Sequence, residues 1–432
     1  MSEHQLPPRA RVSAKPEPLP VQAAGASPLT RRRFLQRAAI AGGLAAAPWL
    51  IPAQALGRDG AAAASERIVL GGIGVGGRGS GVLGWMLPEK DVQFVAVCDA
   101  KKSQREAVKR MVDNHYGNQD CKIYRDMREF LATRPDIDAL LITTGDRWHA
   151  TASVLAMRAG KDVYSEKPSS MTIAEGQAVV ETAKRYGRVY QTGLQRLSEA
   201  NFTFANELLR TGRLGKVHTV RAHIAPWDAA EMRTEWLPAE PEPTKDEVDW
   251  DQWLGPCPWR PYHSSYVRGG WRGFYDFHTS CIGEWGAHTF GQCQVALGLT
   301  NTSACEYDYV NNPTGDCMVT RFPNGVKMIL HREGWWHGSC GVRYEGTEGW
   351  VSIADGYSRP EVSSPALLAD FTKLVRDYMA RTGRPMNHVR NLFDCIKSRR
   401  LTVANPEVMH RSMSTVHAAN ICMWLKRAMK YD

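Results

Sequence analysis

The chain has 432 residues, of which 43% are hydrophobic and 23% are charged, and its mean hydropathy is -0.38. These values are typical of a globular protein of two or three domains, and they exclude disordered, collagen-like and disulfide-scaffold proteins. Much of the net charge of +9 comes from residues 1–55, which hold 7 Lys and Arg against 2 Asp and Glu. The remainder contains no Lys/Arg-rich run, so we expect no nucleic-acid partner.

Residues 1–55 have the pattern of a cleavable export signal. Adjacent arginines at 31–33 precede an apolar stretch over 38–50, and a small-x-small site follows at 53–55. The apolar stretch is too short to span a bilayer, and its glycines and proline argue against an amphipathic helix. We therefore predict export to the periplasm by a route similar to the twin-arginine type, and no membrane span in the mature chain.

The segment that follows, residues 56–65, is rich in Gly and Ala and is predicted to be a linker. The ten cysteines are scattered between Cys98 and Cys422, with neither a C-x-x-C pair nor the spacing of a zinc site. We expect them to be mostly buried thiols, and we expect no metal site.

A glycine-rich turn follows the first predicted strand, residues 67–73. It has the form G-x-G-x-x-G, with glycines at Gly74, Gly76 and Gly79. In a dinucleotide site the first glycine allows the tight turn, the second lets a pyrophosphate approach, and the third lets the next helix pack closely. The phosphates would then bind the amides at the N-terminus of that helix. A turn that serves packing alone is the alternative.

A second predicted strand, residues 92–98, ends at Asp99, twenty residues beyond Gly79. A carboxylate at this place can accept hydrogen bonds from the ribose hydroxyls, which favours NAD over NADP. Asp99 could instead cap the predicted helix over 101–115. NADP remains possible, because three nearby cations could accommodate its 2′-phosphate: Arg78, Lys101 and Lys102.

Strands and helices then alternate. Further strands are predicted at 138–144, 162–165 and 189–194, and helices at 126–133, 149–159 and 172–186. The last helix opens with a capping box, Thr172 to Glu175. Regular alternation of this kind predicts a doubly wound parallel sheet, so residues 66–194 are assigned to a Rossmann dinucleotide-binding domain.

Beyond residue 194 the alternation is lost. Residues 217–224 are predicted to form a strand, and segments at 317–322, 326–331 and 341–344 have the pattern of antiparallel strands. Residues 195–432 are therefore predicted to form a second, α+β domain with a mostly antiparallel sheet, which would bind substrate.

Several short motifs together resemble the Gfo/Idh/MocA family of oxidoreductases. They are the Gly74 turn, Thr144 to His149, the triplet Glu166-Lys167-Pro168, and Gly283 to His288. The stretch from His388 to Ser398 resembles the exported branch of that family. The resemblance implies NAD(P)-dependent oxidation of a sugar or polyol. It also implies an open sheet in the second domain whose bare face pairs subunits into a homo-dimer or homo-tetramer.

The catalytic candidates are Lys167, Glu284 and His288. Lys167 follows the carboxyl end of a predicted parallel strand, where α/β sheets place ligands, and Pro168 restricts its backbone to an extended conformation. Glu284 and His288 are four residues apart, so on one helix they would share a face and the pair could transfer a proton. An ordinary surface lysine and a core histidine are the alternatives.

The resemblance implies further contacts to the cofactor and the substrate. For the cofactor they are Arg78, Asp146, His149, Glu166 and Gln195, and for the substrate Arg272 and Asp276. The chain departs from the family pattern at two positions. Family members commonly have Asp at the position of Glu284 and a second Asp at the position of Gly291. A third departure is His278-Thr279-Ser280, which replaces glycines. We therefore expect an altered pocket floor.

The leading hypothesis is an exported oxidoreductase that transfers a hydride between a carbinol of a sugar, glycoside or polyol and a tightly bound NAD or NADP. The alternative enzyme is an NAD-dependent glycosidase or lyase that oxidises the sugar only transiently. A sugar-binding relative without catalysis is the third hypothesis.

Overall fold

The computed structural model describes residues 63–432 except 225–231, 311–315, 332–339 and 356–358. The chain divides into two compact units, residues 1–53 and 54–432, and all described residues lie in the second. The predicted export signal lies outside the described residues. Among the described helices, none has the length and apolar character needed to cross a membrane.

The first sheet has six parallel strands in the order β3-β2-β1-β4-β5-β6. They are β1 (Ile68–Ile73), β2 (Val92–Cys98), β3 (Lys122–Tyr124), β4 (Ala139–Ile142), β5 (Asp162–Ser165) and β6 (Tyr190–Thr192). This confirms the predicted doubly wound sheet. The strand order reverses between β1 and β4, and such a switch point opens a crevice at the carboxyl ends of the strands.

Five helices alternate with these strands: α2 (Gly77–Met86), α3 (Lys102–Tyr116), α4 (Met127–Thr133), α5 (Asp146–Arg158) and α6 (Ile173–Tyr186). The capping box at the start of α6 forms as predicted. Thr172 accepts a hydrogen bond from the Glu175 amide at 3.1 Å, and the Glu175 carboxylate accepts one from the Met171 amide at 2.6 Å. The reciprocal bonds fix where α6 begins.

The second sheet has eight strands in the order β13-β12-β11-β7-β10-β9-β8-β14. They are β7 (Val217–His223), β8 (Glu306–Tyr309), β9 (Asp316–Arg321), β10 (Lys327–His331), β11 (Val342–Gly346), β12 (Gly349–Ile353), β13 (Glu361–Val362) and β14 (Met429–Lys430). All neighbouring pairs are antiparallel except β7 and β10. The predicted, mostly antiparallel sheet is confirmed.

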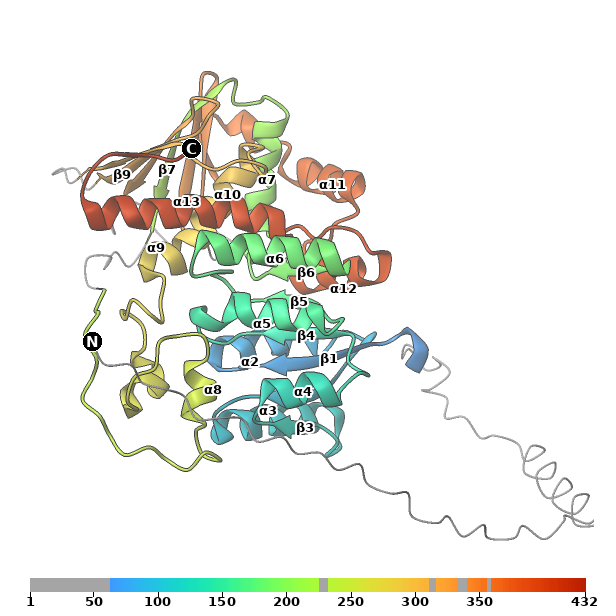
Figure 1. Ribbon diagram of the computed structural model, residues 1–432. Helices are drawn as coiled ribbons and strands as arrows, with labels where there is room; N and C mark the ends of the chain where they lie inside the picture. Colours follow the sequence, from blue (N-terminus) through green and yellow to red (C-terminus); the bar gives the residue numbers. More distant parts are fainter. Residues whose placement is uncertain (1–62, 225–231, 311–315, 332–339, 356–358) are drawn as a thin grey trace, which may run out of the picture. The chain divides into compact units, whose positions relative to one another are not determined.

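Helices cover one face of the second sheet. They are α7 (Ala200–Arg210), α10 (Gly286–Ala296) and α13 (Pro406–Leu425), and their side chains share one buried core with the sheet, including Val220, Phe290, Leu330 and Val416. Helix α11 (Phe371–Thr382) packs on α7. Helices α6 and α13 lie side by side, so the longest helix of the second domain contacts the Rossmann domain directly (Figure 1).

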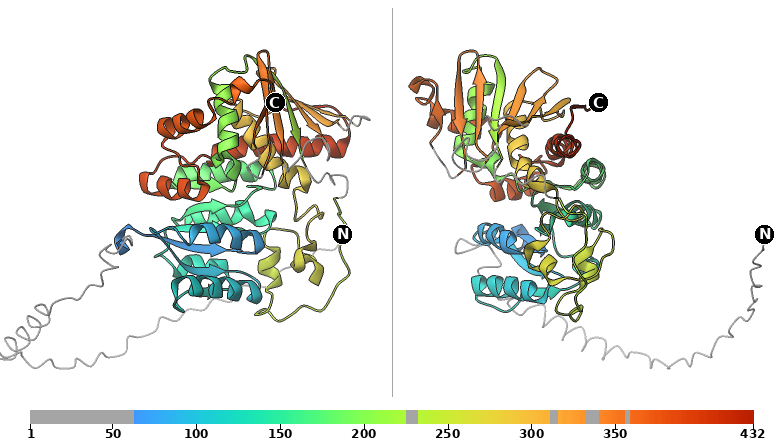
Figure 2. Two further views of the ribbon diagram at one scale, coloured as in Figure 1. Left: turned by 180° about the vertical axis from the view of Figure 1, so that it is seen from behind. Right: turned by 90° about the vertical axis from the view of Figure 1, so that its left-hand side faces the viewer.

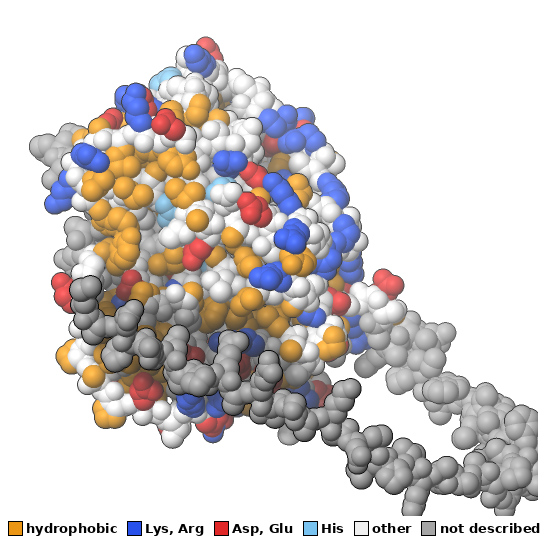
Figure 3. All heavy atoms as spheres, in the orientation of Figure 1, with side chains coloured by type: hydrophobic (Ala, Val, Ile, Leu, Met, Phe, Trp, Pro, Cys, Tyr) orange, Lys and Arg blue, Asp and Glu red, His pale blue; other side chains and the backbone are white. Residues whose placement is uncertain are grey.

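Helix α12 (His388–Ser398) belongs to the predicted second domain but packs against the first sheet. Its Leu392 and Phe393 are fully buried there. Arg390 and Lys397 form ion pairs with Asp91 at 2.7 and 2.5 Å. Burial alone would raise the pKa of Asp91, but these two cations lower it to about 2. Figure 3 shows Lys and Arg side chains gathered on the side where α11 and α12 lie, and ion pairs engage part of them.

Replacing Gly74 by alanine tests the turn that joins β1 to α2. Gly74 has a φ of +66°, and a Cβ there would lie 2.9 Å from the Cα of Thr144. An alanine in this conformation costs about 1–2 kcal/mol before the clash is added. Gly81 is the control, because a Cβ there meets nothing within 4 Å and alanine favours a helix. We expect a lower Tm for Gly74→Ala and an unchanged or higher Tm for Gly81→Ala. Equal Tm values would contradict this account.

Candidate active site

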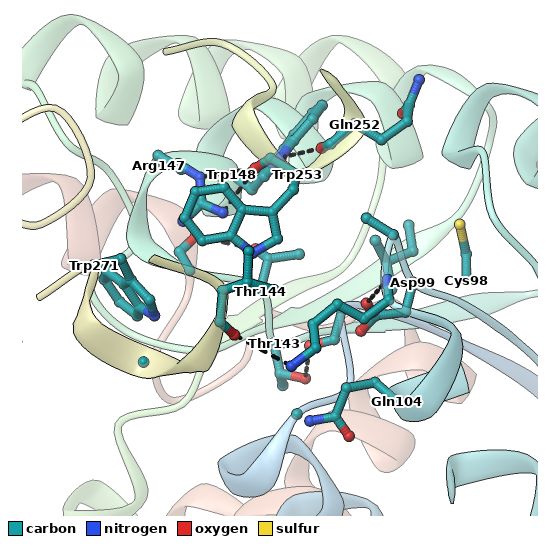
Figure 4. Close-up of a pocket in the computed structure, with 18 of the residues that line it drawn as sticks. Cys98, Asp99, Gln104, Thr143, Thr144, Arg147, Trp148, Gln252, Trp253 and Trp271 are labelled. Atoms are coloured by element: carbon teal, nitrogen blue, oxygen red, sulfur yellow. Dashed lines mark hydrogen bonds between the residues drawn. The ribbon is translucent and has the colours of Figure 1, made fainter. Parts of the chain in front are cut away.

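A cavity of about 390 Å³ lies at the switch point of the first sheet. Its lining includes the turn from Gly74 to Arg78, Asp99 at the end of β2, and Thr144 after β4. The opposite wall comes from residues 252–272. In Figure 4, Asp99 and Gln104 lie toward one end, Trp271 lies toward the other, and Trp253 lies between them.

The glycine turn leaves room for a ligand. A Cβ at Gly76 would meet only the Gln104 side chain, at 3.9 Å, and one at Gly77 would meet nothing within 4 Å. A Cβ at Gly79 would lie 2.1 Å from Thr143 Oγ1, so this glycine allows α2 to pack closely on the strands. The start of α2 therefore has room beside it for a bound pyrophosphate.

Asp99 lines the cavity at the end of β2. One carboxylate oxygen accepts a hydrogen bond from the Lys101 amide at 2.8 Å. Burial raises the pKa of Asp99 to about 6, against the opposing effects of that amide and of the charges of Lys101 and Arg105. Asp99 is not the N-cap of α3, which is Lys101. Its second oxygen is the group that would accept ribose hydroxyls.

The three cations that could have bound a 2′-phosphate are engaged elsewhere. The Lys101 ammonium donates to the Val267 carbonyl at 3.2 Å. Lys102 pairs with Asp246 at 2.7 Å, and Arg78 pairs with Glu166 at 3.4 Å. These pairings favour NAD, whose ribose carries no phosphate at this place.

Residues 246–272, here called the roof, cover the cavity and include α8 (Trp250–Leu254). Figure 2 shows this yellow-green part of the chain beside the blue elements of the first sheet. Backbone hydrogen bonds join the roof to the start of α3. The Lys102 amide donates to the Glu247 carbonyl and the Asp249 amide donates to the Ala100 carbonyl, both at 3.0 Å.

Arg147, on α5, holds the middle of the roof. Its Nε and Nη2 donate to the Trp253 carbonyl at 3.0 and 2.7 Å, and its guanidinium lies 3.6 Å from the centre of the Trp253 ring. Beside it, Trp148 donates to the Gln252 carbonyl at 3.0 Å. Burial lowers the pKa of Arg147 to about 10, which still leaves it charged at neutral pH. One side of the cavity is thus an aromatic and cationic wall.

Lys167 lies just beyond β5. Its ammonium donates to the Glu284 carbonyl at 2.9 Å, lies 3.9 Å from a Glu284 carboxylate oxygen, and lies 5.2 Å from the centre of the Trp285 ring. The side chain is largely buried. Lys167 therefore has a fixed direction rather than the freedom of a surface lysine.

The Glu284 carboxylate binds three cationic or imidazole groups. Besides Lys167, it accepts from His278 Nε2 at 3.0 Å and from Arg272 Nε at 3.3 Å. Burial alone would raise the pKa of Glu284, but the His278 hydrogen bond and the charges of Lys167 and Arg272 lower it to about 2. His278 Nδ1 accepts from the Gly273 amide at 3.2 Å, so Nε2 carries the proton donated to Glu284.

His288 is nearly buried on α10 and stands apart from the Glu284 network. Helix α9 (Ser280–Glu284) ends before Trp285 and α10 begins after it, so the two residues do not share one continuous helix. Within the described residues, Nδ1 of His288 has no hydrogen-bond partner. Burial, and then the charges of Arg196 and Lys167, hold the pKa of His288 well below its usual value. The imidazole is therefore neutral.

The other predicted residues lie behind or beside this site. Gln195 donates to Glu166 at 2.9 Å and to Tyr164 at 2.8 Å. His149 faces the Pro168 carbonyl at 2.7 Å with one ring nitrogen and the Thr144 carbonyl at 3.1 Å with the other. Asp146 accepts from Thr279, and Asp276 pairs with Arg260. As arranged here, these groups position neighbouring segments, and their contacts with ligands stay predictions.

Comparison with protein families identifies the chain. The family model described as "Oxidoreductase family, NAD-binding Rossmann fold" matches residues 68–194, and the model for the "C-terminal alpha/beta domain" of the same family matches residues 217–432. The chain belongs to the Gfo/Idh/MocA oxidoreductase family. It therefore carries the NAD-binding Rossmann domain of that family.

Individual relatives of this Gfo/Idh/MocA protein are distant. Myo-inositol 2-dehydrogenase of Thermotoga maritima is 30% identical over 100 residues, which are 23% of this chain and 30% of the relative. A glycosyl hydrolase family 109 protein of Saccharopolyspora erythraea is 31% identical over 175 residues, 38% of each chain. These matches span about a third of the relatives' length.

A solved structure shares the fold. It is the WlbA dehydrogenase from Chromobactrium violaceum, crystallised with NADH and UDP-GlcNAcA. The similarity has a TM-score of 0.62 at 15% identity, and it covers 85% of this chain and 96% of that one. At this identity the likeness shows the fold alone.

Sequence reasoning missed the roof and the position of His278. Trp253, Trp271 and Arg147 line the cavity, but the many tryptophans of this region are also explained by packing alone. The sequence did contain a signal for His278, because this residue stands where the family commonly has glycine. An imidazole added near a catalytic candidate needs a hydrogen-bond partner. That partner is Glu284.

The raised pKa of Asp99 leads to a prediction about cofactor binding. The ionised carboxylate accepts hydroxyl hydrogen bonds more strongly than the protonated form, and Asp99 becomes protonated as the pH falls through about 6. We expect bound dinucleotide to be lost progressively between pH 7 and pH 5, measured by nucleotide absorbance after rapid gel filtration. Asp99→Asn is expected to bind weakly at every pH in this range. Wild-type retention by Asp99→Asn would mean that Asp99 serves only the Lys101 turn.

Proposed function

We propose that this protein is an exported oxidoreductase that transfers a hydride between a sugar, glycoside or polyol carbinol and a tightly bound NAD. The proposal rests on two features of the structure that share Arg272. One is a cavity with the geometry of a dinucleotide site, which Arg272 lines. The other is the chain of contacts that starts there, because Arg272 binds Glu284 and Glu284 fixes the ammonium of Lys167, while the neutral imidazole of His288 is the second proposed catalytic group. The names of the relatives, an inositol dehydrogenase and a glycoside-acting protein, support this substrate class.

The chain's own residues have separate tasks in this reaction. NAD, when bound, supplies the hydride acceptor. The Lys167 ammonium donates a hydrogen bond to the substrate hydroxyl and stabilises negative charge as it develops on the oxygen. His288, being neutral, accepts the hydroxyl proton. Glu284 stays ionised and keeps Lys167 in place, while the roof excludes water from the reacting carbons.

A second candidate is an NAD-dependent glycosidase or lyase, favoured by the match to a glycosyl hydrolase family 109 protein. Transient oxidation of a ring carbon acidifies a neighbouring C–H, elimination follows, and the same hydride is returned. Analysis of products from a glycoside separates the two reactions. The oxidoreductase yields an oxidised sugar, whereas the second candidate yields a free leaving group without net oxidation.

We also propose that the protein acts in the periplasm as a homo-oligomer. The export signal supports the first statement. The proposal of a homo-oligomer concerns the face of the second sheet that lies opposite its core. Side chains alternate along β7, so Val220 and Ala222 point into the core and Arg221 points to the other face. On that face Arg221 pairs with Glu345 at 3.0 Å. This face of the sheet is the one that the family resemblance assigns to subunit pairing.

Two substitutions test the catalytic roles. Lys167→Met and His288→Ala are each expected to lower the turnover rate about a hundredfold to ten-thousandfold, the usual loss for a positioned acid or base. Bound dinucleotide should stay near the wild-type level. Because the pKa of His288 is lowered, the kcat/KM of wild-type protein, expressed per dinucleotide bound, should not fall as the pH decreases through 6.5. Near-wild-type turnover in both variants would show that the chemistry lies elsewhere.

Export implies that the cofactor remains bound through many turnovers, since little free NAD is expected outside the cytoplasm. The bound cofactor must then pass its hydride to a second, carbonyl-bearing substrate in ping-pong fashion, or back to the first substrate after it has changed. We expect exported protein to keep its dinucleotide through dialysis and, when both substrates are supplied, to need no added cofactor. Arg147→Met should speed dinucleotide release at least about tenfold, because two charge-assisted hydrogen bonds to the roof are lost. Arg158→Met, at the exposed end of the same helix, is the matched control. An empty protein whose activity rises in proportion to added NAD would refute tight binding.

A further inference from the structure

We propose that the substrate carries an acidic group, so that this protein acts on sugar acids and binds their carboxylate through Arg272. The proposal rests on the function proposed above and names the substrate class for the same site. Three observations support it: the charge around the cavity, the unused donors of Arg272, and the position of Arg272 relative to Lys167.

The site has more positive charge than a dinucleotide neutralises. Its cations are the lining residues Arg78, Lys101, Arg125, Arg147, Arg268 and Arg272, together with Lys167. The carboxylates that line the cavity or pair with these cations are Asp99, Glu166, Asp249 and Glu284. A reduced dinucleotide, with its two phosphates, leaves one positive charge, and the oxidised form, whose nicotinamide is itself positively charged, leaves two. A substrate carboxylate would offset one of these charges, whereas a neutral sugar would offset none.

Arg272 has donors available for such a group. The guanidinium stacks on the Trp271 ring at 4.5 Å and turns only Nε toward Glu284. Among the described residues, its two terminal nitrogens have no hydrogen-bond partner, and about half of the side chain, 53%, is exposed. Two parallel N–H groups on a planar guanidinium match the two oxygens of a carboxylate.

The position of Arg272 fits a substrate rather than the adenosine half of the cofactor. Lys167 Nζ and Arg272 Nε both lie within 4.0 Å of the same Glu284 oxygen, at 3.9 and 3.4 Å. A carboxylate on the terminal nitrogens of Arg272 would therefore lie about one sugar ring from the hydroxyl that Lys167 binds. Asp99, which marks the ribose end, lies at the far end of the cavity from Trp271, the ring on which Arg272 stacks (Figure 4).

Binding measurements on the cofactor-loaded protein test the proposal. The probes are D-glucuronate, D-galacturonate and D-mannuronate, their methyl esters, the neutral parent sugars and the sugar 6-phosphates, titrated by calorimetry. We expect at least one uronate to bind about tenfold or more tightly than its ester and its neutral parent. In Arg272→Gln this preference should disappear while bound dinucleotide is unchanged. Arg272→Lys keeps the charge but not the two parallel donors, so part of the preference should remain.

Arg233→Gln is the matched control, because Arg233 is exposed near Gly273 but does not line the cavity. It should keep the full preference. The proposal is overturned if neutral sugars bind as well as uronates, if sugar phosphates are preferred, or if Arg272→Gln keeps the preference. Loss of dinucleotide from Arg272→Gln would also overturn it, by assigning Arg272 to a cofactor phosphate. Failure of the proposed function is a separate result, namely no hydride transfer with any probe.

Discussion

The site depends on the contacts of one ionised group, the carboxylate of Glu284. It is held between His278, Arg272 and Lys167, and it stays ionised because these groups outweigh the cost of burial. Without it, the cations of Arg272 and Lys167 would repel each other beside the cavity. The arrangement links the Rossmann domain, which supplies Lys167, to the second domain, which supplies Glu284.

The roof, residues 246–272, shapes the site from the other side of the cavity. Its hydrogen bonds to α3 and to Arg147 place tryptophan rings over the crevice where the dinucleotide would lie. Contacts of this kind with a bound dinucleotide would slow its release, as proposed above. Slow release has a cost for a dehydrogenase that exchanges its cofactor at every turnover. Slow release suits the export proposed above, because an exported protein must regenerate its cofactor in place.

The elements that depend on local sequence could be predicted, and those that depend on distant contacts could not. The glycine turn, the parallel strands and the capping box at Thr172 follow from neighbouring residues, and the structure contains them. The roof depends on bonds between Arg147 and Trp253, 106 residues apart. The four-residue spacing suggested a Glu284–His288 pair, but the helix is interrupted at Trp285 and His278 takes that place. Likewise, no local pattern could show that α12 returns to the first sheet.

The most direct test of the account is a single turnover with protein that has been freed of unbound nucleotide. A candidate sugar acid or sugar deuterated at the carbinol carbon is mixed with this protein, and the bound nucleotide is then extracted. The account predicts that reduced nicotinamide appears without added cofactor, in an amount no greater than the protein, and that its C4 carries the deuterium. Protein-bound nucleotide that never acquires deuterium from any sugar, sugar acid, glycoside or polyol would contradict it.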